Sequence, residues 1–188
     1  MTQTRSLVSS IGIATGLILA AAVLPAVAAS GGSGGSSGAS TPVVCNAGWV
    51  YDKQKQICVP VHGMNDKDLY EQGRALALAG YYENALAALT AIQNQNDAMV
   101  LTMIGYSKRK MGAVDEGMAY YHRALAIDPN NVNTREYLGE GYVVMGRLDL
   151  AQGELDRIGA ICGDGCDQYL DLAAAMAGVE DWAGTATN

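Results

Sequence analysis

Four cysteines and two histidines are the side chains of this sequence that could do chemistry. Cys162 and Cys166 are separated by Gly-Asp-Gly, and as a dithiol they could exchange disulfides or bind a metal with Asp164 or Asp167 nearby. Redox centres more often place two residues between their cysteines, at a helix N-terminus that lowers a thiol pKa. The two glycines beside Asp164 suit a tight turn closed by a bridge. We therefore predict a structural disulfide, with thiol-redox or metal chemistry as the alternative.

The other two cysteines, Cys45 and Cys58, bracket a short module at residues 45–60. Four cysteines allow three connectivities, and pairing between neighbours in the chain is the simplest. Residues 49–51 and 57–59 favour strands, and the polar residues between them favour a turn. A Cys45–Cys58 bridge would close residues 45–58 into a ring, and entropy models credit such a bridge with roughly 3 kcal/mol of stability. The pattern predicts a disulfide-stapled hairpin.

The same module has a second interpretation. Its Cys, Gly, aromatic and Asp residues resemble those of chitin-binding modules, which implies a glycan site over residues 45–58 that uses Trp49 and Tyr51. A stapled hairpin with no ligand is the simpler interpretation.

The remaining residues show no catalytic arrangement. His62 falls in a linker and His122 on an expected helix, and neither accompanies a nucleophile. The sequence contains no glycine-rich phosphate loop and no pair of histidines spaced for zinc on a helix. We expect no enzymatic activity, no cofactor and no metal. The formal net charge of -7 argues against nucleic acid, because phosphate backbones need a clustered basic surface.

The N-terminal segment predicts export. Residues 1–29 begin with one basic residue, Arg5, continue with an apolar run at 11–24, and end in small residues that offer cleavage after Ala28 or Ala29. A retained membrane anchor is the alternative, but a bilayer span needs roughly 20 apolar residues. After cleavage we expect no stable membrane span and a periplasmic or secreted protein, in which disulfides persist.

Glycines recur through the second half of the chain. Gly73, Gly105 and Gly139 follow one another at intervals of 32 and 34 residues. The same intervals separate three further sets: Gly80, Gly112 and Gly146; Ala85, Gly117 and Ala151; and Ile92, Ala124 and Ile158. A period near 34 with small residues at these places resembles the tetratricopeptide repeat (TPR) family, in its bacterial exported type.

The resemblance implies an all-α fold, a right-handed solenoid of helical hairpins. About three TPR repeats are expected within a domain at residues 66–178, at 66–97, 98–131 and 132–165. A capping helix at 167–178 covers the last hydrophobic face. A Gly/Ser-rich flexible linker at 30–44 and the stapled hairpin precede the repeats, and residues 179–188 form a flexible tail.

In this family the first helices of successive repeats line a concave groove, which implies a protein or peptide partner. The positions expected to be exposed there are Lys67, Tyr70, Arg74, Tyr106, Arg109, Lys110, Glu136 and Glu140. The basic residues of the first two repeats could receive a partner's carboxylates. Reversing Arg109 and Lys110 to Glu is then expected to keep the helical signal and to weaken capture at low salt. The alternative is a merely solvated helix face.

Overall fold

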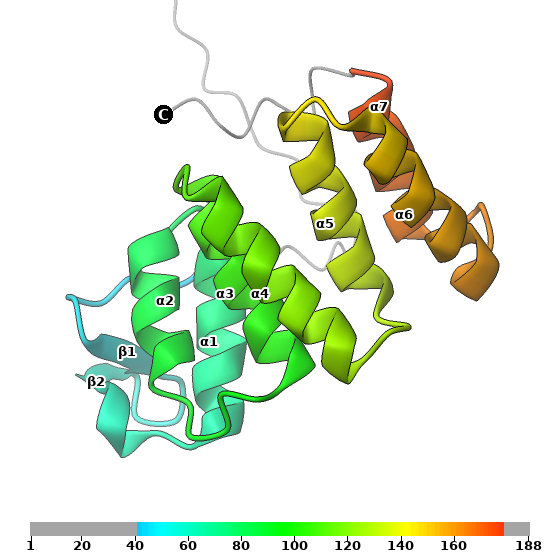
Figure 1. Cartoon of the computed structure of the whole chain (residues 1–188). Helices are drawn as coiled ribbons and strands as arrows, with labels where there is room; N and C mark the ends of the chain where they lie inside the picture. The colour runs from blue at the N-terminus through cyan, green and yellow to red at the C-terminus, as the bar shows by residue number, and fades with distance from the viewer. Residues whose placement is uncertain (1–40, 179–188) are drawn as a thin grey trace, which may run out of the picture. The chain divides into compact units, whose positions relative to one another are not determined.

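The structure is a computed structural model that describes residues 41–178. The expected signal peptide, most of the Gly/Ser linker and the expected C-terminal tail lie outside the described residues. Helices dominate the described part and follow one another as antiparallel pairs (Figure 1). The pairs are α1 (Asp66–Leu78) with α2 (Tyr82–Thr90), α3 (Ala98–Lys110) with α4 (Val114–Ile127), and α5 (Val132–Val144) with α6 (Leu148–Cys162), followed by α7 (Asp167–Met176). The predicted all-α solenoid of helical hairpins is confirmed.

The turn inside each helical pair explains one set of recurring glycines. Gly80, Gly112 and Gly146 follow α1, α3 and α5 and have φ values of 86°, 89° and 70°. Only glycine adopts this left-handed conformation without steric cost. In each turn the next residue donates its N–H back to a carbonyl near the end of the helix, over 2.8–3.0 Å. This is the Schellman arrangement, which satisfies carbonyls that the helix leaves unpaired.

A second set of glycines lies where helices cross. A methyl group added at Gly73 would lie 2.6 Å from Leu89 Cγ, and one added at Gly105 would lie 2.8 Å from Tyr121 Cε1. These neighbours belong to the second helix of the same pair. At Gly139 the neighbour is instead Leu172 of α7, at 2.5 Å. The seventh helix therefore takes part in the packing of the third pair.

The first helix of every pair also begins in the same way. Asn65, Asp97 and Asn131 precede α1, α3 and α5, and each accepts a hydrogen bond from a backbone N–H in the first turn, at 2.8–3.1 Å. Such caps satisfy donors that have no partner inside the helix, and each typically contributes about 1 kcal/mol. The second helices α2, α4 and α6 have no side-chain cap. Their positions therefore depend on the glycine turns and on packing.

The hairpin at the start of the described chain covers one end of the repeats. Strands β1 (Trp49–Asp52) and β2 (Ile57–Pro60) pair antiparallel, and a disulfide joins Cys45 to Cys58. Val50 is 1% exposed and packs in one cluster with Leu69 of α1. Asn84 Nδ2 of α2 donates to the Cys45 carbonyl over 2.8 Å. The hairpin thus shields the first helical pair from water.

Helix α7 covers the other end. Leu172 is fully buried in a cluster with Leu155 and Ile158 of α6. The turn before α7 carries the second disulfide, Cys162–Cys166. Repeat arrays need such a cover, because the last repeat otherwise exposes its hydrophobic face. Separately, none of the helices within residues 41–178 has the length and apolar character that crossing a membrane requires.

Candidate partner-binding groove

The first helices of the three pairs enclose a pocket of about 340 Å³, which we call the groove pocket. Helix α1 contributes two of its lining residues, α3 three, and α5 with its N-cap three. They are Tyr70, Arg74, Met99, Thr102, Met103, Asn131, Asn133 and Tyr137. An adjoining pocket of about 270 Å³ shares Tyr70 and Met99 and extends toward Lys67 and Asp97. A surface of this kind can hold an apolar side chain together with a few polar groups.

Three of the residues predicted from the sequence lie at these two pockets. Tyr70 is half-buried and Arg74 is exposed, and both line the groove pocket. Lys67 lines the adjoining pocket, and its Nζ lies 2.5 Å from Glu71 Oε1. Because both partners are exposed, this ion pair contributes little to stability. The structure therefore brings Lys67, Tyr70 and Arg74 to one side of the groove.

Tyr106 belongs to a row of aromatic rings that links the helical pairs. Its ring centroid lies 6.3 Å from that of Tyr82 in α2 and 4.9 Å from that of Tyr137 in α5. The neighbouring cation Lys110 has its Nζ 5.8 Å from the Tyr106 centroid. Burial lowers the pKa of Lys110, and it raises the pKa of Tyr106 to about 12. Tyr106 is thus part of the packing as much as of the surface.

The structure corrects the expected exposure of Arg109, Glu136 and Glu140. Their exposed fractions are 5%, 7% and 6%, so none of them is the solvated groove residue that the repeat pattern predicts. The reason lies in pairing between successive repeats. Arg109 of α3 forms an ion pair with Glu140 of α5, and its Nε donates to Tyr121 Oη of α4 over 3.2 Å. A spacing pattern shows which positions share a helix face, but not that two of them pair with each other.

The position of Arg109 between α3 and α4 also explains Gly117. The first and third pairs have Ala85 and Ala151 where the second has Gly117, and a methyl group at Gly117 would lie 2.8 Å from both Arg109 Cβ and the Gly105 carbonyl oxygen. Helices α3 and α4 therefore approach more closely here than an alanine would allow. Burial by itself lowers the pKa of Arg109, but Tyr121 and Glu140 outweigh it and hold the pKa above its usual value. Arg109 stays charged inside the protein.

Glu136 is a buried carboxyl with a strongly shifted pKa. Burial is the main cause, followed by the carboxylates of Glu140, Asp171 and, more weakly, Asp167, which outweigh the opposing effect of Arg109. Together they raise its pKa to about 8, from an ordinary value of 4.5. Glu136 is therefore largely protonated at neutral pH.

A measurable pH dependence follows from this shift. Between about pH 4.5 and 8 the folded protein holds a proton on Glu136 that the unfolded chain has lost, so Glu136 reduces stability as the pH rises. Glu136→Gln should remove this loss. Thermal unfolding at pH 5, 7 and 9 should show the variant gaining on wild type as the pH rises, whereas the exposed control Glu83→Gln should follow wild type. Parallel curves for Glu136→Gln and wild type would contradict the assignment.

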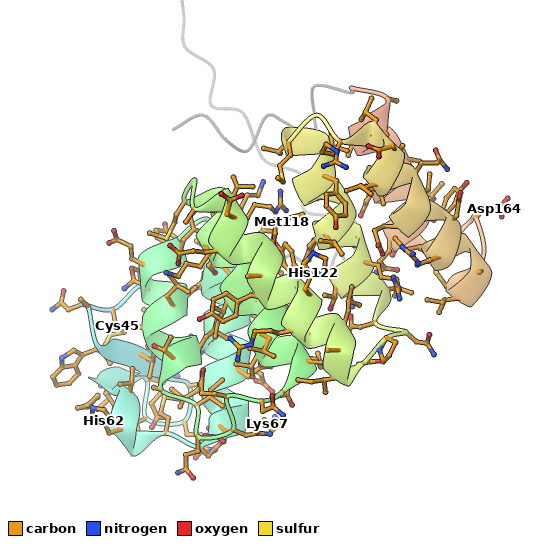
Figure 2. All side chains as sticks on the ribbon, in the orientation of Figure 1. Cys45, His62, Lys67, Met118, His122 and Asp164 are labelled. Carbon is orange, nitrogen blue, oxygen red and sulfur yellow. A yellow bond between two sulfur atoms is a disulfide. The ribbon has the colours of Figure 1, made fainter. Side chains whose placement is uncertain are left out.

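The cysteine and histidine sites do not converge. Cys162 and Cys166 form a disulfide, as predicted, and Asp164 projects from the turn between them (Figure 2). Figure 2 also shows His62 and His122 well apart from each other. His122 Nε2 lies 3.4 Å from a tyrosine hydroxyl, Tyr142 Oη. Within residues 41–178 no three His, Cys, Asp or Glu side chains are grouped so that they could hold a metal ion.

The hairpin module presents one aromatic side chain to solvent. Trp49 is 45% exposed, while Tyr51 is half-buried and lines a pocket of about 150 Å³ with Asp52 and Glu71. The two aromatic side chains are therefore unequal in accessibility. The glycan interpretation stays a prediction.

Several groove residues were not identified from the sequence as binding residues. Met99 is 49% exposed although it is apolar, and Met103 and Tyr137 lie beside it in the groove pocket. The spacing of four between the two methionines places them on one face of α3. That signal could have indicated an apolar floor, but it is equally typical of a core face.

The helical pairs, the glycine turns and the capping helix define a TPR-like helical fold. Among solved structures, the crystal structure of MamA has this fold, with a TM-score of 0.50 over 65% of this chain and 74% of that chain. The two sequences are 19% identical, so the likeness concerns the fold alone. No protein-family model matches the chain, and the search of curated proteins found no match.

Proposed function

We propose that this chain is an exported scaffold that binds a protein or peptide segment in the groove lined by α1, α3 and α5. The groove pocket carries the proposal, because it joins an exposed methionine, two tyrosines and an exposed arginine from three successive helical pairs. Helix-lined grooves of this kind bind segments through a few anchor side chains. Lys67, Tyr70 and Arg74 are the contact residues, joined by Met99 and Tyr137. Tyr106 and Lys110 extend this surface along α3.

Two features support export. The order of charge, apolar run and small residues in 1–29 is that of a secretory signal. All four cysteines are paired in disulfides, which form and persist in oxidising compartments such as the periplasm or the extracellular space. The partner is therefore sought among proteins of the cell envelope or the medium.

Met99→Glu tests the groove directly. Met99 is half exposed, so the change should leave the unfolding temperature within a few degrees of wild type, and it should place a charge in the apolar part of the groove pocket. We expect capture of partner proteins from envelope extract, measured by quantitative mass spectrometry, to fall at least tenfold. Met145→Glu is the matched control, since Met145 is 45% exposed and lies outside the groove pocket. Equal capture by both variants would show that the partner uses another surface.

A further inference from the structure

The charges around the groove pocket are divided between its two sides. On the α1 side, Arg74 is exposed and makes no hydrogen bond or ion pair with another residue of 41–178. On the α5 side, Asn133 lines the pocket and its Oδ1 accepts a hydrogen bond from Gln168 Nε2 of α7 over 3.0 Å. The first turn of α7 therefore adjoins the pocket. A cation borders one side and the start of an acidic helix the other.

Within the part of the chain that the structure describes, no basic side chain pairs with the acidic residues on the α7 side. Asp167 and Asp171 of α7 are exposed, and neither forms an ion pair within residues 41–178. Arg109, a buried cation of α3, is paired with Glu140. Burial is the main cause of the raised pKa of Glu136, and Asp171 and Asp167 add to it, so these two carboxylates act on the α5 side of the groove. Unneutralised carboxylates next to a pocket attract a cationic group.

Between the two sides the pocket is apolar and aromatic. Met99 and Met103 of α3 lie there with Tyr70 and Tyr137 from the flanking helices. A volume of about 340 Å³ accommodates a large side chain and part of the backbone that carries it. Exposed carboxylates such as Asp167 and Asp171 form charge-assisted hydrogen bonds with an amine or a guanidinium of a partner.

We propose that the groove pocket receives a partner segment of mixed charge, with a large apolar side chain between an acidic residue that contacts Arg74 and a basic residue that lies against Asp167 and Asp171. This inference rests on the proposed function and adds the charge order of the partner. A purely acidic segment would satisfy Arg74 but would be repelled at α7. A purely basic segment would pair with Asp167 and Asp171 but would be repelled by Arg74. The divided charge therefore selects the orientation as well as the class of segment.

Selection from a phage-displayed library of random 12-residue peptides tests this inference. The full chain is immobilised at low salt, where exposed charges act most strongly. We expect the enriched peptides to carry an aromatic or long aliphatic residue flanked by an acid on one side and a base on the other. Enrichment of peptides that carry only one sign of charge would overturn the proposal. Enrichment of uncharged peptides, or no enrichment of any peptide, would overturn it as well.

Variants then assign each charge in an enriched peptide. Arg74→Ala should weaken binding roughly fivefold, and replacing the acidic residue of the peptide should then have no further effect. Asp171→Asn should also weaken binding roughly fivefold, and replacing the basic residue of the peptide should then have no further effect. The exposed controls Arg123→Ala and Asp115→Asn should change neither the affinity for the peptide nor its need for the two charged residues. Asp171→Lys combined with a peptide whose base is replaced by Glu should recover affinity.

If Met99→Glu abolishes binding but the charge variants have no effect, the charge order is wrong and the groove function stands. If Met99→Glu has no effect either, the groove function itself is wrong.

Discussion

Replacing Arg109 with Ala should lower the free energy of unfolding by about 3–5 kcal/mol, the usual cost of removing one member of a buried ion pair. The change takes away the guanidinium that pairs with Glu140 and donates to Tyr121, and it opens space between α3 and α4. In a chain of this size the melting temperature should fall by roughly 10 °C, measured by circular dichroism. This replaces the expectation from the repeat pattern that charge reversal at Arg109 is structurally silent.

The matched control for this prediction is Arg123→Ala, because Arg123 is exposed on α4 and its guanidinium lies over the Tyr120 ring, 5.1 Å from the ring centroid. We expect it to change the melting temperature by less than about 2 °C. The double variant Arg109→Met/Glu140→Gln should recover part of the loss, since replacing both charges removes the penalty of burying one alone. If Arg109→Ala and Arg123→Ala have the same melting temperature, the Arg109–Glu140 pair contributes nothing to the stability of the fold.

Gly105→Leu is expected to have a comparable or larger effect. The first added carbon would already lie 2.8 Å from Tyr121 Cε1 and 2.9 Å from the Gly117 carbonyl oxygen, and the backbone oxygen cannot move without shifting α4. Overpacking typically costs 1–3 kcal/mol, and contact with backbone places this site at about 3 kcal/mol or more. Helical content should fall or the melting temperature should drop by roughly 10 °C.

Gly153→Leu is the control for the glycine variant. Gly153 is also helical, but a methyl group there meets only Arg157 Nη1, at 3.8 Å. Because leucine has a higher helix propensity than glycine, the change should stabilise the protein slightly. Equal melting temperatures for the two leucine variants would mean that the crossing of α3 and α4 is wrong.

The fold was predictable because the repeat constrains the backbone at fixed intervals. Gly80, Gly112 and Gly146 are needed for their φ values, and Gly73 and Gly105 for the approach of a second helix, so both sets appear in the sequence at the same two spacings. The local disulfides followed from short separations in the chain. These features depend on each repeat alone, and each repeat is a short, continuous segment.

The site was only partly predictable because it depends on contacts between repeats. Lys67, Tyr70 and Arg74 lie at the groove as expected, since α1 is the first helix of its pair. Arg109 and Glu140 occupy equivalent-looking positions but pair with each other across α3 and α5, which no spacing reveals. The packing of the hairpin against α1 and α2 was not visible in the sequence for the same reason. The capping helix was predicted, but not that Leu172 of α7 fills the space beside Gly139.

We have proposed that the groove of α1, α3 and α5 holds a protein partner. Site-specific photocrosslinking in living cells tests it most directly, with a photoreactive amino acid placed at Met99, at Met145 or at Trp49. All three side chains are about half exposed, so the probe should be tolerated equally at each. We predict a discrete crosslinked protein from Met99 and none from Met145 or Trp49. Crosslinks from Trp49 or Met145 with none from Met99 would contradict the account and move the binding surface away from the groove.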